Sequence, residues 1–160
     1  MSIEDDIAFL ERIPTLRLLG RTALRILAIG AESRYVHHGE ILFTEGETAD
    51  CAYVIQEGSF TVRSDALRGS EAELIAESGT LLGELAMLTE TRRPATATAR
   101  EPSTVIRISR SLFLKMLEGY PEAAVQMRAQ IAARTRESIS DVARLRKRFD
   151  AGGEPGGGAA

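Results

Sequence analysis

Three residues in one short segment have the types that a small anionic ligand requires. Gly83 precedes Glu84 at the expected start of a short helix over Glu84–Leu88, and Arg93 follows further along the chain. A glycine lets a ligand approach the backbone closely, and the amide groups at the start of a helix bind anions. Glu84 would repel a phosphate but can accept a hydrogen bond from a hydroxyl group of the same ligand, while Arg93 can neutralise the phosphate. The segment therefore predicts a site for a ligand with one phosphate and one nearby hydroxyl.

Taken alone, each of these residues has a simpler interpretation. Gly83 and Glu84 are more typical of a plain turn followed by a carboxylate that the helix dipole favours. Arg92 and Arg93 are equally consistent with surface charges, since a buried arginine is costly without an anion. The order of motifs along the chain favours the ligand site.

The segment from Leu82 to Ala97 resembles the phosphate-binding cassette of cyclic-nucleotide-binding domains, the sensor domains of catabolite-activator-like proteins among them. That cassette begins Phe-Gly-Glu-Leu-Ala and continues Pro-Arg-Ala/Ser/Thr-Ala, and the residues that match it here are Gly83, Glu84, Leu85, Ala86, Arg93 and Ala95. Upstream residues resemble the same family's framework, namely Gly39-Glu40-Ile41, Gly46-Glu47, Asp50, Tyr53-Val54-Ile55 and Gly58. The resemblance covers residues 9–149 and implies a cyclic nucleotide as the ligand.

The resemblance also implies a role for each matching residue. Glu84 would bind the ribose 2′-hydroxyl, Gly83 and neighbouring amides would hold the ribose and cyclic phosphate, and Arg93 would pair with the phosphate. The long C-terminal helix would cover the base, with Arg134 near Glu84 and Ser138 against the adenine amino group. The resulting ligand-binding residues are Gly83, Glu84, Leu85, Ala86, Arg93, Pro94, Ala95, Arg134 and Ser138.

Pro94 departs from the family, which usually has Ala, Ser or Thr after the arginine. Proline has no backbone N–H, so one phosphate hydrogen bond, worth roughly 1.5–3 kcal/mol, is lost. We expect this loss to weaken nucleotide affinity tenfold or more. The family's cGMP-preferring members have Thr at this position, so its absence favours cAMP over cGMP.

The elements that would position these residues indicate an α+β fold, an antiparallel, jelly-roll-like β-roll of eight strands flanked by N-terminal and C-terminal helices. Helical spacing predicts one helix around Ile3, Ile7 and Leu10, interrupted at Pro14, and a second that ends at Gly30. Short apolar runs separated by turns are typical of a β sandwich or barrel. The predicted strands are Arg34–Val36, Glu40–Phe43, Ala52–Gln56, Ser59–Arg63, Ala72–Ala76, Ala95–Ala99 and Thr104–Ile108.

Two helices are predicted after the strands. Ser109 or Ser111 caps the first, which ends at Gly119, and the second runs from Pro121 to Phe149. The second carries a heptad seam that favours, by a small margin over packing on its own roll, a homodimer through residues 121–149. We expect one domain over residues 1–150 and a flexible glycine-rich tail over residues 151–160.

Composition and charge exclude several other classes of protein. The formal net charge of −3 lacks the basic excess of nucleic-acid-binding proteins. No apolar run approaches the ~18 residues of a membrane span, and the acidic N-terminus does not resemble a signal peptide. The single cysteine, Cys51, cannot form an internal disulfide. These features predict a cytoplasmic protein without a membrane segment.

We expect no enzymatic activity, because the sequence shows no nucleophile–base pair, metal-ligand cluster or phosphate-binding loop. Apart from the cyclic nucleotide, no cofactor is expected. Glycines follow the long helix where related transcription factors have a helix-turn-helix, so no DNA-binding domain is expected. Two alternatives remain open. One is a degenerate domain that binds no nucleotide and serves as a protein-interaction scaffold, which Pro94 favours. The other is a subunit that regulates a protein effector in trans.

Overall fold

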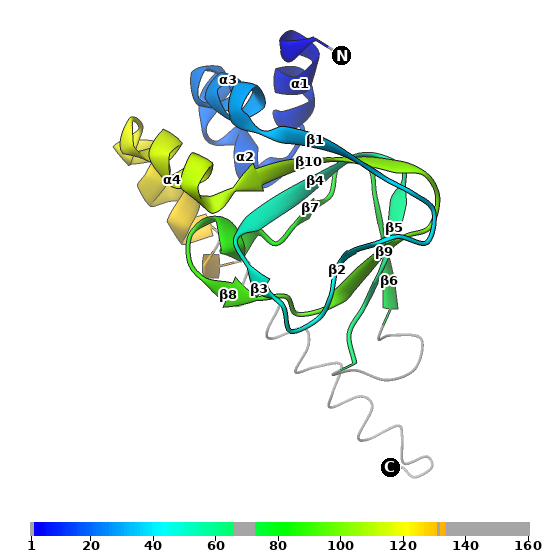
Figure 1. Cartoon of the computed structure of the whole chain (residues 1–160). Coiled ribbons are helices and arrows are strands. Elements are labelled where there is room, and N and C mark those ends of the chain that lie inside the picture. Colours follow the sequence, from blue (N-terminus) through cyan, green and yellow to red (C-terminus); the bar gives the residue numbers. More distant parts are fainter. Residues whose placement is uncertain (1, 66–72, 131, 134–160) are drawn as a thin grey trace, which may run out of the picture.

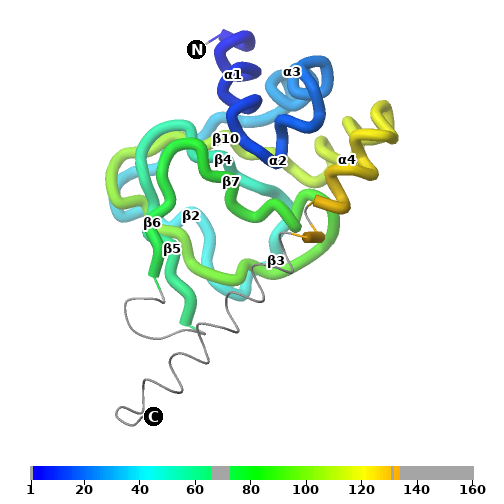
Figure 2. The backbone as a smooth tube through the Cα atoms, turned by 180° about the vertical axis from the view of Figure 1, so that it is seen from behind, coloured from blue at the N-terminus to red at the C-terminus, as the bar shows by residue number. Residues whose placement is uncertain are grey.

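The computed structural model describes residues 2–65, 73–130 and 132–133. Two views, Figures 1 and 2, show a β-roll with its helices gathered at one end, beside the strands labelled β10 and β4. The helices are α1 (Ile3–Leu10), α2 (Pro14–Arg17), α3 (Gly20–Gly30) and α4 (Arg110–Glu118), and residues 121–130 are also helical. The α+β architecture expected from the sequence is therefore the observed one.

Ten strands lie within the described residues, and every pair of neighbouring strands is antiparallel. Their bounds are β1 (Glu32–Val36), β2 (Ile41–Phe43), β3 (Thr48–Ala49), β4 (Cys51–Glu57), β5 (Ser59–Arg63), β6 (Glu73–Glu77), β7 (Leu81–Leu82), β8 (Thr91–Arg92), β9 (Thr96–Ala99) and β10 (Ser103–Ser109). One sheet has the order β1-β10-β4-β7, a second has β2-β9-β5-β6, and β3 pairs with β8. Strands distant in sequence thus enclose the inside of the roll.

The buried side chains form two hydrophobic clusters, one on each face of β4. Successive side chains of a strand point to opposite faces. Accordingly Ala52 and Val54 join the helix-side cluster, which contains the buried residues of α1, α3 and α4. Cys51, Tyr53 and Ile55 belong to the roll cluster, which lines the inside of the roll. The same strand therefore anchors the helices and forms one wall of the roll.

The ends of the helices follow from local sequence signals. The Ser2 side chain accepts a hydrogen bond from the Asp5 amide in a capping box that begins α1. Pro14 occupies the first turn of α2, where its missing N–H costs no helical hydrogen bond, so it starts this short helix after α1 has ended at Leu10. Ser109 caps α4 by accepting from the Leu112 amide at 3.1 Å.

The seven predicted strand ranges all occur, with ends that coincide with the observed ones or differ by at most two residues. The prediction of a roll with eight strands was wrong in number, because ten strands lie within the described residues. The seven ranges omitted the two-residue strands β3, β7 and β8, which are too short for an alternating pattern. The long helix is observed as far as residue 130. Residues 132 and 133 are helical as well, whereas the rest of its predicted course, with the whole heptad seam and the glycine-rich tail, lies outside the described residues.

Candidate functional site

The segment that carries the predicted site runs from β7 through a short 3-10 helix, Glu84–Met87, to β8. Gly83 joins β7 to this helix with a φ of 83°, which lies in the left-handed region that glycine adopts readily. A Cβ atom at Gly83 would lie 2.4 Å from Nη1 of Arg93 and 3.3 Å from the carbonyl oxygen of Cys51. Both the backbone conformation and the approach of the arginine therefore require glycine here.

The backbone of Arg93 is fixed on both sides by the turn that follows β2. The Arg93 amide donates to the carbonyl of Glu47 at 2.8 Å, and the Arg93 carbonyl accepts from the amide of Gly46 at 2.8 Å. Exposed Arg92 adds a third link, from its Nη1 to the Gly46 carbonyl at 2.8 Å. These bonds direct the Arg93 side chain into the roll.

The guanidinium of Arg93 lies inside the roll, and the residue is 5% exposed. Its Cζ atom is 4.4 Å from the ring centroid of Phe43 and 5.5 Å from that of Tyr53, distances typical of cation–π contacts. Nη2 donates to the sulfur of Cys51 at 3.3 Å, whereas Nη1 is buried and has no hydrogen-bond partner in the described part of the chain. Aromatic faces and a thiol therefore surround this cation, and none of the ion pairs between described residues includes it.

Tyr53 does not supply the missing negative charge. Burial, and then its hydrogen bond with Cys51, raises the pKa of the Tyr53 hydroxyl above its ordinary value of 10.0. The hydroxyl is therefore protonated and neutral at physiological pH. From the sequence, Cys51 was only excluded from an internal disulfide, but in the folded protein it contacts both Arg93 and Tyr53.

Glu84 lies at the start of the 3-10 helix and is half-buried. Its Oε2 accepts a hydrogen bond from the hydroxyl of Thr15 at 3.0 Å. Thr15 belongs to α2 and is 0% exposed. The N-terminal helices therefore hold one oxygen of the carboxylate that the sequence assigns to a ligand hydroxyl.

Arg110, the first residue of α4, contacts the same segment from the helical side. Its Nη1 donates to the carbonyl of Ala49 at 3.2 Å and to the carbonyl of Ala86 at 3.3 Å. The Arg110 amide also donates to the carbonyl of Asp50 at 2.8 Å. The start of α4 is thus attached both to the 3-10 helix and to the end of β3 and Asp50, directly before the strand β4 that bears Cys51 and Tyr53.

The structure brings some of the predicted residues together and separates others. Gly83 and Arg93 are in contact. Ala86 and Ala95, which follow them closely in the sequence, are both buried. Leu85 is half-buried and packs against the helix-side cluster. Pro94 is exposed, between two buried neighbours. Arg134 and Ser138 lie outside the described residues.

Sequence reasoning missed four residues at this site: Thr15, Phe43, Cys51 and Tyr53. For Cys51 and Tyr53 a signal existed, because they alternate along a strand whose other face carries Ala52 and Val54. For Thr15 there was none, since its contact with Glu84 joins positions 69 residues apart.

Within the described residues, no group of three or more His, Cys, Asp or Glu side chains could hold a metal ion. In the same part of the chain, no helix is long and apolar enough to cross a membrane.

Comparisons with known proteins agree on one family. The model of the cyclic nucleotide-binding domain matches residues 33–120. A solved structure of a cyclic nucleotide-binding-like protein from Brucella abortus is 38% identical, with a TM-score of 0.62, and the match covers 71% of this chain and 98% of that one. The regulatory domain of Toxoplasma gondii PKA with cAMP, at 19% identity, has a TM-score of 0.69 over 84% of this chain and 50% of that chain, which shows the shared fold.

Curated relatives are longer proteins. The cAMP-dependent protein kinase regulatory subunit of Yarrowia lipolytica is 32% identical over 68% of this chain and 28% of its own length. The lysophospholipase nte1 of Neurospora crassa is 30% identical over 69% of this chain but only 7% of its own length. The chain therefore spans a small part of these relatives.

Proposed function

Because the chain belongs to the cyclic nucleotide-binding domain family, we propose that it binds a cyclic nucleotide inside the roll, cAMP in preference to cGMP, and that it acts as a regulatory module without catalysis of its own. The observation that carries this proposal is Nη1 of Arg93, a buried cationic donor with no hydrogen-bond partner among the described residues. Removing a charged group from water costs several kcal/mol unless it is paired. A cyclic phosphate would supply the charge and the acceptor that this group lacks.

The contacts of Arg93 suit the exchange of partners that binding requires. Its present hydrogen bond is to a thiol, a weak acceptor. A phosphate oxygen forms a shorter and stronger charge-assisted bond with a guanidinium. The absence of a Cβ at Gly83 keeps the space next to Nη1 free of side-chain atoms from this position. These features support the assignment of Gly83 and Arg93 to the phosphate.

Glu84 is the residue that we assign to the ribose 2′-hydroxyl. The Thr15 hydroxyl already fixes Oε2, and a carboxylate can accept several hydrogen bonds. A ribose hydroxyl would donate a further one. Leu85, Ala86 and Ala95 would form the apolar surroundings of these polar groups.

Pro94 supports cAMP over cGMP only through the resemblance, since it stands where cGMP-preferring relatives have Thr. It has no N–H to donate, and it is exposed. We therefore expect Pro94 to weaken phosphate binding rather than abolish it. The guanidinium of Arg93 lies inside the roll, and its position does not depend on an N–H at residue 94.

We further propose that binding is signalled through the C-terminal helices. Arg110 links the carbonyl of Ala86 to the start of α4, so a shift of the 3-10 helix would act on α4 and on the helix that begins at Pro121. Closure of the long helix, with Arg134 and Ser138 against the ligand, would complete the switch. A homodimer through residues 121–149, or a protein effector acted on in trans, would receive the signal. A ligand drives such a change only by its differential affinity for the two states.

Calorimetric titration of nucleotide-free protein with cAMP and cGMP tests the proposal. We expect saturable binding of cAMP, weaker binding of cGMP, and weaker binding of 2′-deoxy-cAMP than of cAMP. Arg17→Ala is the control for loss of one arginine, because Arg17 is exposed on α2 and takes no part in the bonds that hold Arg93, and it should leave the affinity unchanged. No heat of binding for either nucleotide would favour the alternative, a domain that serves as an interaction scaffold.

A further inference from the structure

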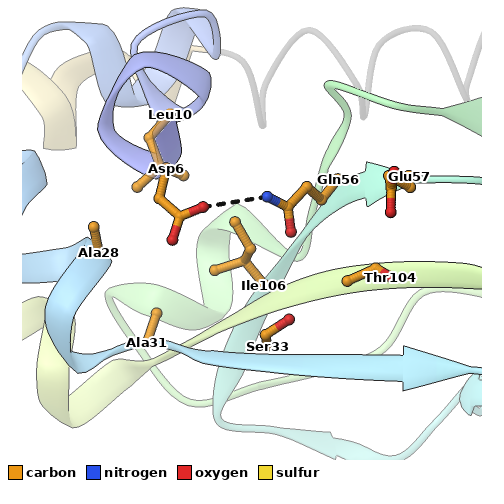
Figure 3. Close-up of a pocket in the computed structure, with 9 residues that line it drawn as sticks. All are labelled: Asp6, Leu10, Ala28, Ala31, Ser33, Gln56, Glu57, Thr104 and Ile106. Carbon is orange, nitrogen blue, oxygen red and sulfur yellow. Dashed lines mark hydrogen bonds between the residues drawn. The ribbon is translucent and has the colours of Figure 1, made fainter. Parts of the chain in front are cut away.

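A cavity of about 350 Å³ lies between α1 and the sheet that contains β1, β10 and β4 (Figure 3). Side chains from α1, the end of α3 and three strands line it, and none of the residues assigned above to the nucleotide is among them. Its volume is within the range of small-molecule sites, roughly 300–1,000 Å³. The cavity is therefore a separate candidate site.

One part of the lining is apolar. Leu10 of α1 is 0% exposed and Ile106 of β10 is 6% exposed, so both belong to the helix-side cluster that the cavity borders. Ala28 and Ala31 line it near the end of α3, where their single methyl groups leave space between the helices and the sheet. A short aliphatic group would find apolar contacts here.

The other part of the lining is polar and carries negative charge. Asp6 of α1 is half-buried, and Glu57 at the end of β4 is exposed. Gln56 donates from Nε2 to Oδ1 of Asp6 at 3.3 Å, which joins α1 to β4 as Figure 3 shows. The hydroxyl groups of Ser33 and Thr104 add further hydrogen-bonding capacity.

None of the described residues that line this cavity is basic. The arginines of the neighbouring elements form ion pairs with other carboxylates: Arg25 with Glu4 at 2.6 Å, and Arg107 with Glu32 at 3.3 Å. None of the ion pairs between described residues includes Asp6 or Glu57. The cavity therefore combines two carboxylates that lack a cationic partner with an apolar surface and neutral donors and acceptors.

We propose that this cavity binds a small organic cation, a guanidinium or ammonium group on a short aliphatic chain. Half-buried Asp6 holds the cationic group, exposed Glu57 adds negative charge to the lining, and the aliphatic chain packs on Leu10 and Ile106. A half-buried carboxylate attracts a cation more strongly than a fully solvated one, because the effective dielectric is lower. The bound cation would also brace α1 against the sheet.

Titration of the ¹⁵N-labelled full chain with butylguanidinium, followed by NMR, tests this site. Saturable shifts are expected at amides of the cavity, with little change at Gly83 or Arg93. N-butylurea is the neutral probe of similar shape, and it should bind at least tenfold more weakly, a difference of about 1.4 kcal/mol. Equal binding of the two probes would show that the carboxylates do not recognise the ligand.

Three altered proteins test the charge of the cavity and its volume separately. Asp6→Asn combined with Glu57→Gln keeps the acceptor for Gln56 and should weaken butylguanidinium binding about tenfold. Glu90→Gln with Glu118→Gln removes the same charge at exposed positions that do not line the cavity and should have little effect. Ala28→Leu fills the cavity without changing charge and should abolish saturable shifts.

Thermal unfolding verifies that each variant is folded. The proposal is overturned if wild-type shifts do not saturate, or if the distant charge control weakens binding as much as the cavity variant. It is also overturned if folded Ala28→Leu protein binds butylguanidinium as well as the wild type.

Discussion

The two hydrophobic clusters on either face of β4 differ in what they enclose. The helix-side cluster contains only apolar side chains, with Phe113 at 0% exposed. The roll cluster surrounds the charged guanidinium of Arg93, held by aromatic rings and one weak hydrogen bond. Burial of apolar surface stabilises a fold, whereas burial of an unpaired charge opposes it. The helix-side cluster thus adds to the free energy of unfolding. The roll cluster adds less, because it encloses the Arg93 guanidinium, which is kept for ligand binding.

The largest effect that can test this contrast is the loss of Phe113. Phe113→Ala removes a fully buried ring from the helix-side cluster and should lower the free energy of unfolding by ~3–5 kcal/mol. Urea denaturation of the nucleotide-free protein measures this. The nucleotide affinity of the folded protein should change by much less than that of an Arg93 variant. A loss below about 1 kcal/mol would mean that the two clusters do not differ in stability as described.

Arg93→Met should show the opposite pattern. Loss of the guanidinium should weaken cyclic nucleotide binding by ~3 kcal/mol. The free energy of unfolding should nevertheless rise by ~1 kcal/mol, because an apolar side chain of similar length replaces an unpaired buried charge. Calorimetry and urea denaturation of one protein preparation measure both quantities. Arg17→Met, at an exposed position of α2, should change neither. Marked destabilisation by Arg93→Met would show that Arg93 is a structural part of the roll cluster.

Thr15→Val tests the hydrogen bond that reaches Glu84 from the helical end of the molecule. Valine keeps the shape of the fully buried side chain but removes the hydroxyl that donates to Oε2. The free energy of unfolding should fall by ~1.5 kcal/mol, since the lost bond is to a charged group. The ratio of the affinities for cAMP and 2′-deoxy-cAMP should also fall, and Thr15→Ser should restore both. An unchanged ratio would limit Thr15 to packing.

The smallest expected effect lies at the surface of the roll, outside both clusters. The backbone amide of His37, and then the Arg34 guanidinium, hold the pKa of Glu40 below its ordinary value of 4.5. Since the folded pKa is the lower one, the stability from Glu40 is present above pH 4.5 and is lost as the pH falls through that folded pKa. Glu40→Gln should therefore be less stable than the wild type near neutral pH, with the difference vanishing in acid. A pH series of urea denaturations measures it, and a constant difference would contradict this origin.

The fold was predictable where the sequence has an alternating or helical pattern. The strand Ser59–Arg63 was predicted with its observed bounds, and the observed helix cap, Ser109, was one of the two serines predicted for that role. The two-residue strands were missed, because β3 and β8 exist only through their pairing with each other. Their register depends on tertiary structure, which no local window contains.

The site was predictable only as far as one continuous segment reaches. Gly83, Glu84 and Arg93 follow from the cassette-like motif, and the contact between Gly83 and Arg93 agrees with it. Phe43 and Thr15 come from elements whose distance from that segment is set by the closure of the roll and the docking of α2. The sequence also indicated that burying the charge of Arg93 costs free energy. The rings of Phe43 and Tyr53, which reduce this cost, are brought to Arg93 only by folding.

Pro94 has a second consequence, which concerns the entropy of binding. A residue that precedes proline is restricted to extended backbone conformations, so Arg93 explores fewer conformations even in the unfolded chain. In the folded protein, two backbone hydrogen bonds to the turn at Gly46 and Glu47 fix Arg93 further. A ligand that engages the guanidinium therefore has only side-chain torsions to immobilise, at ~0.5–1.5 kcal/mol for a flexible side chain. Pro94 thus removes one hydrogen-bond donor, but it also lowers the conformational entropy that Arg93 loses when the ligand binds.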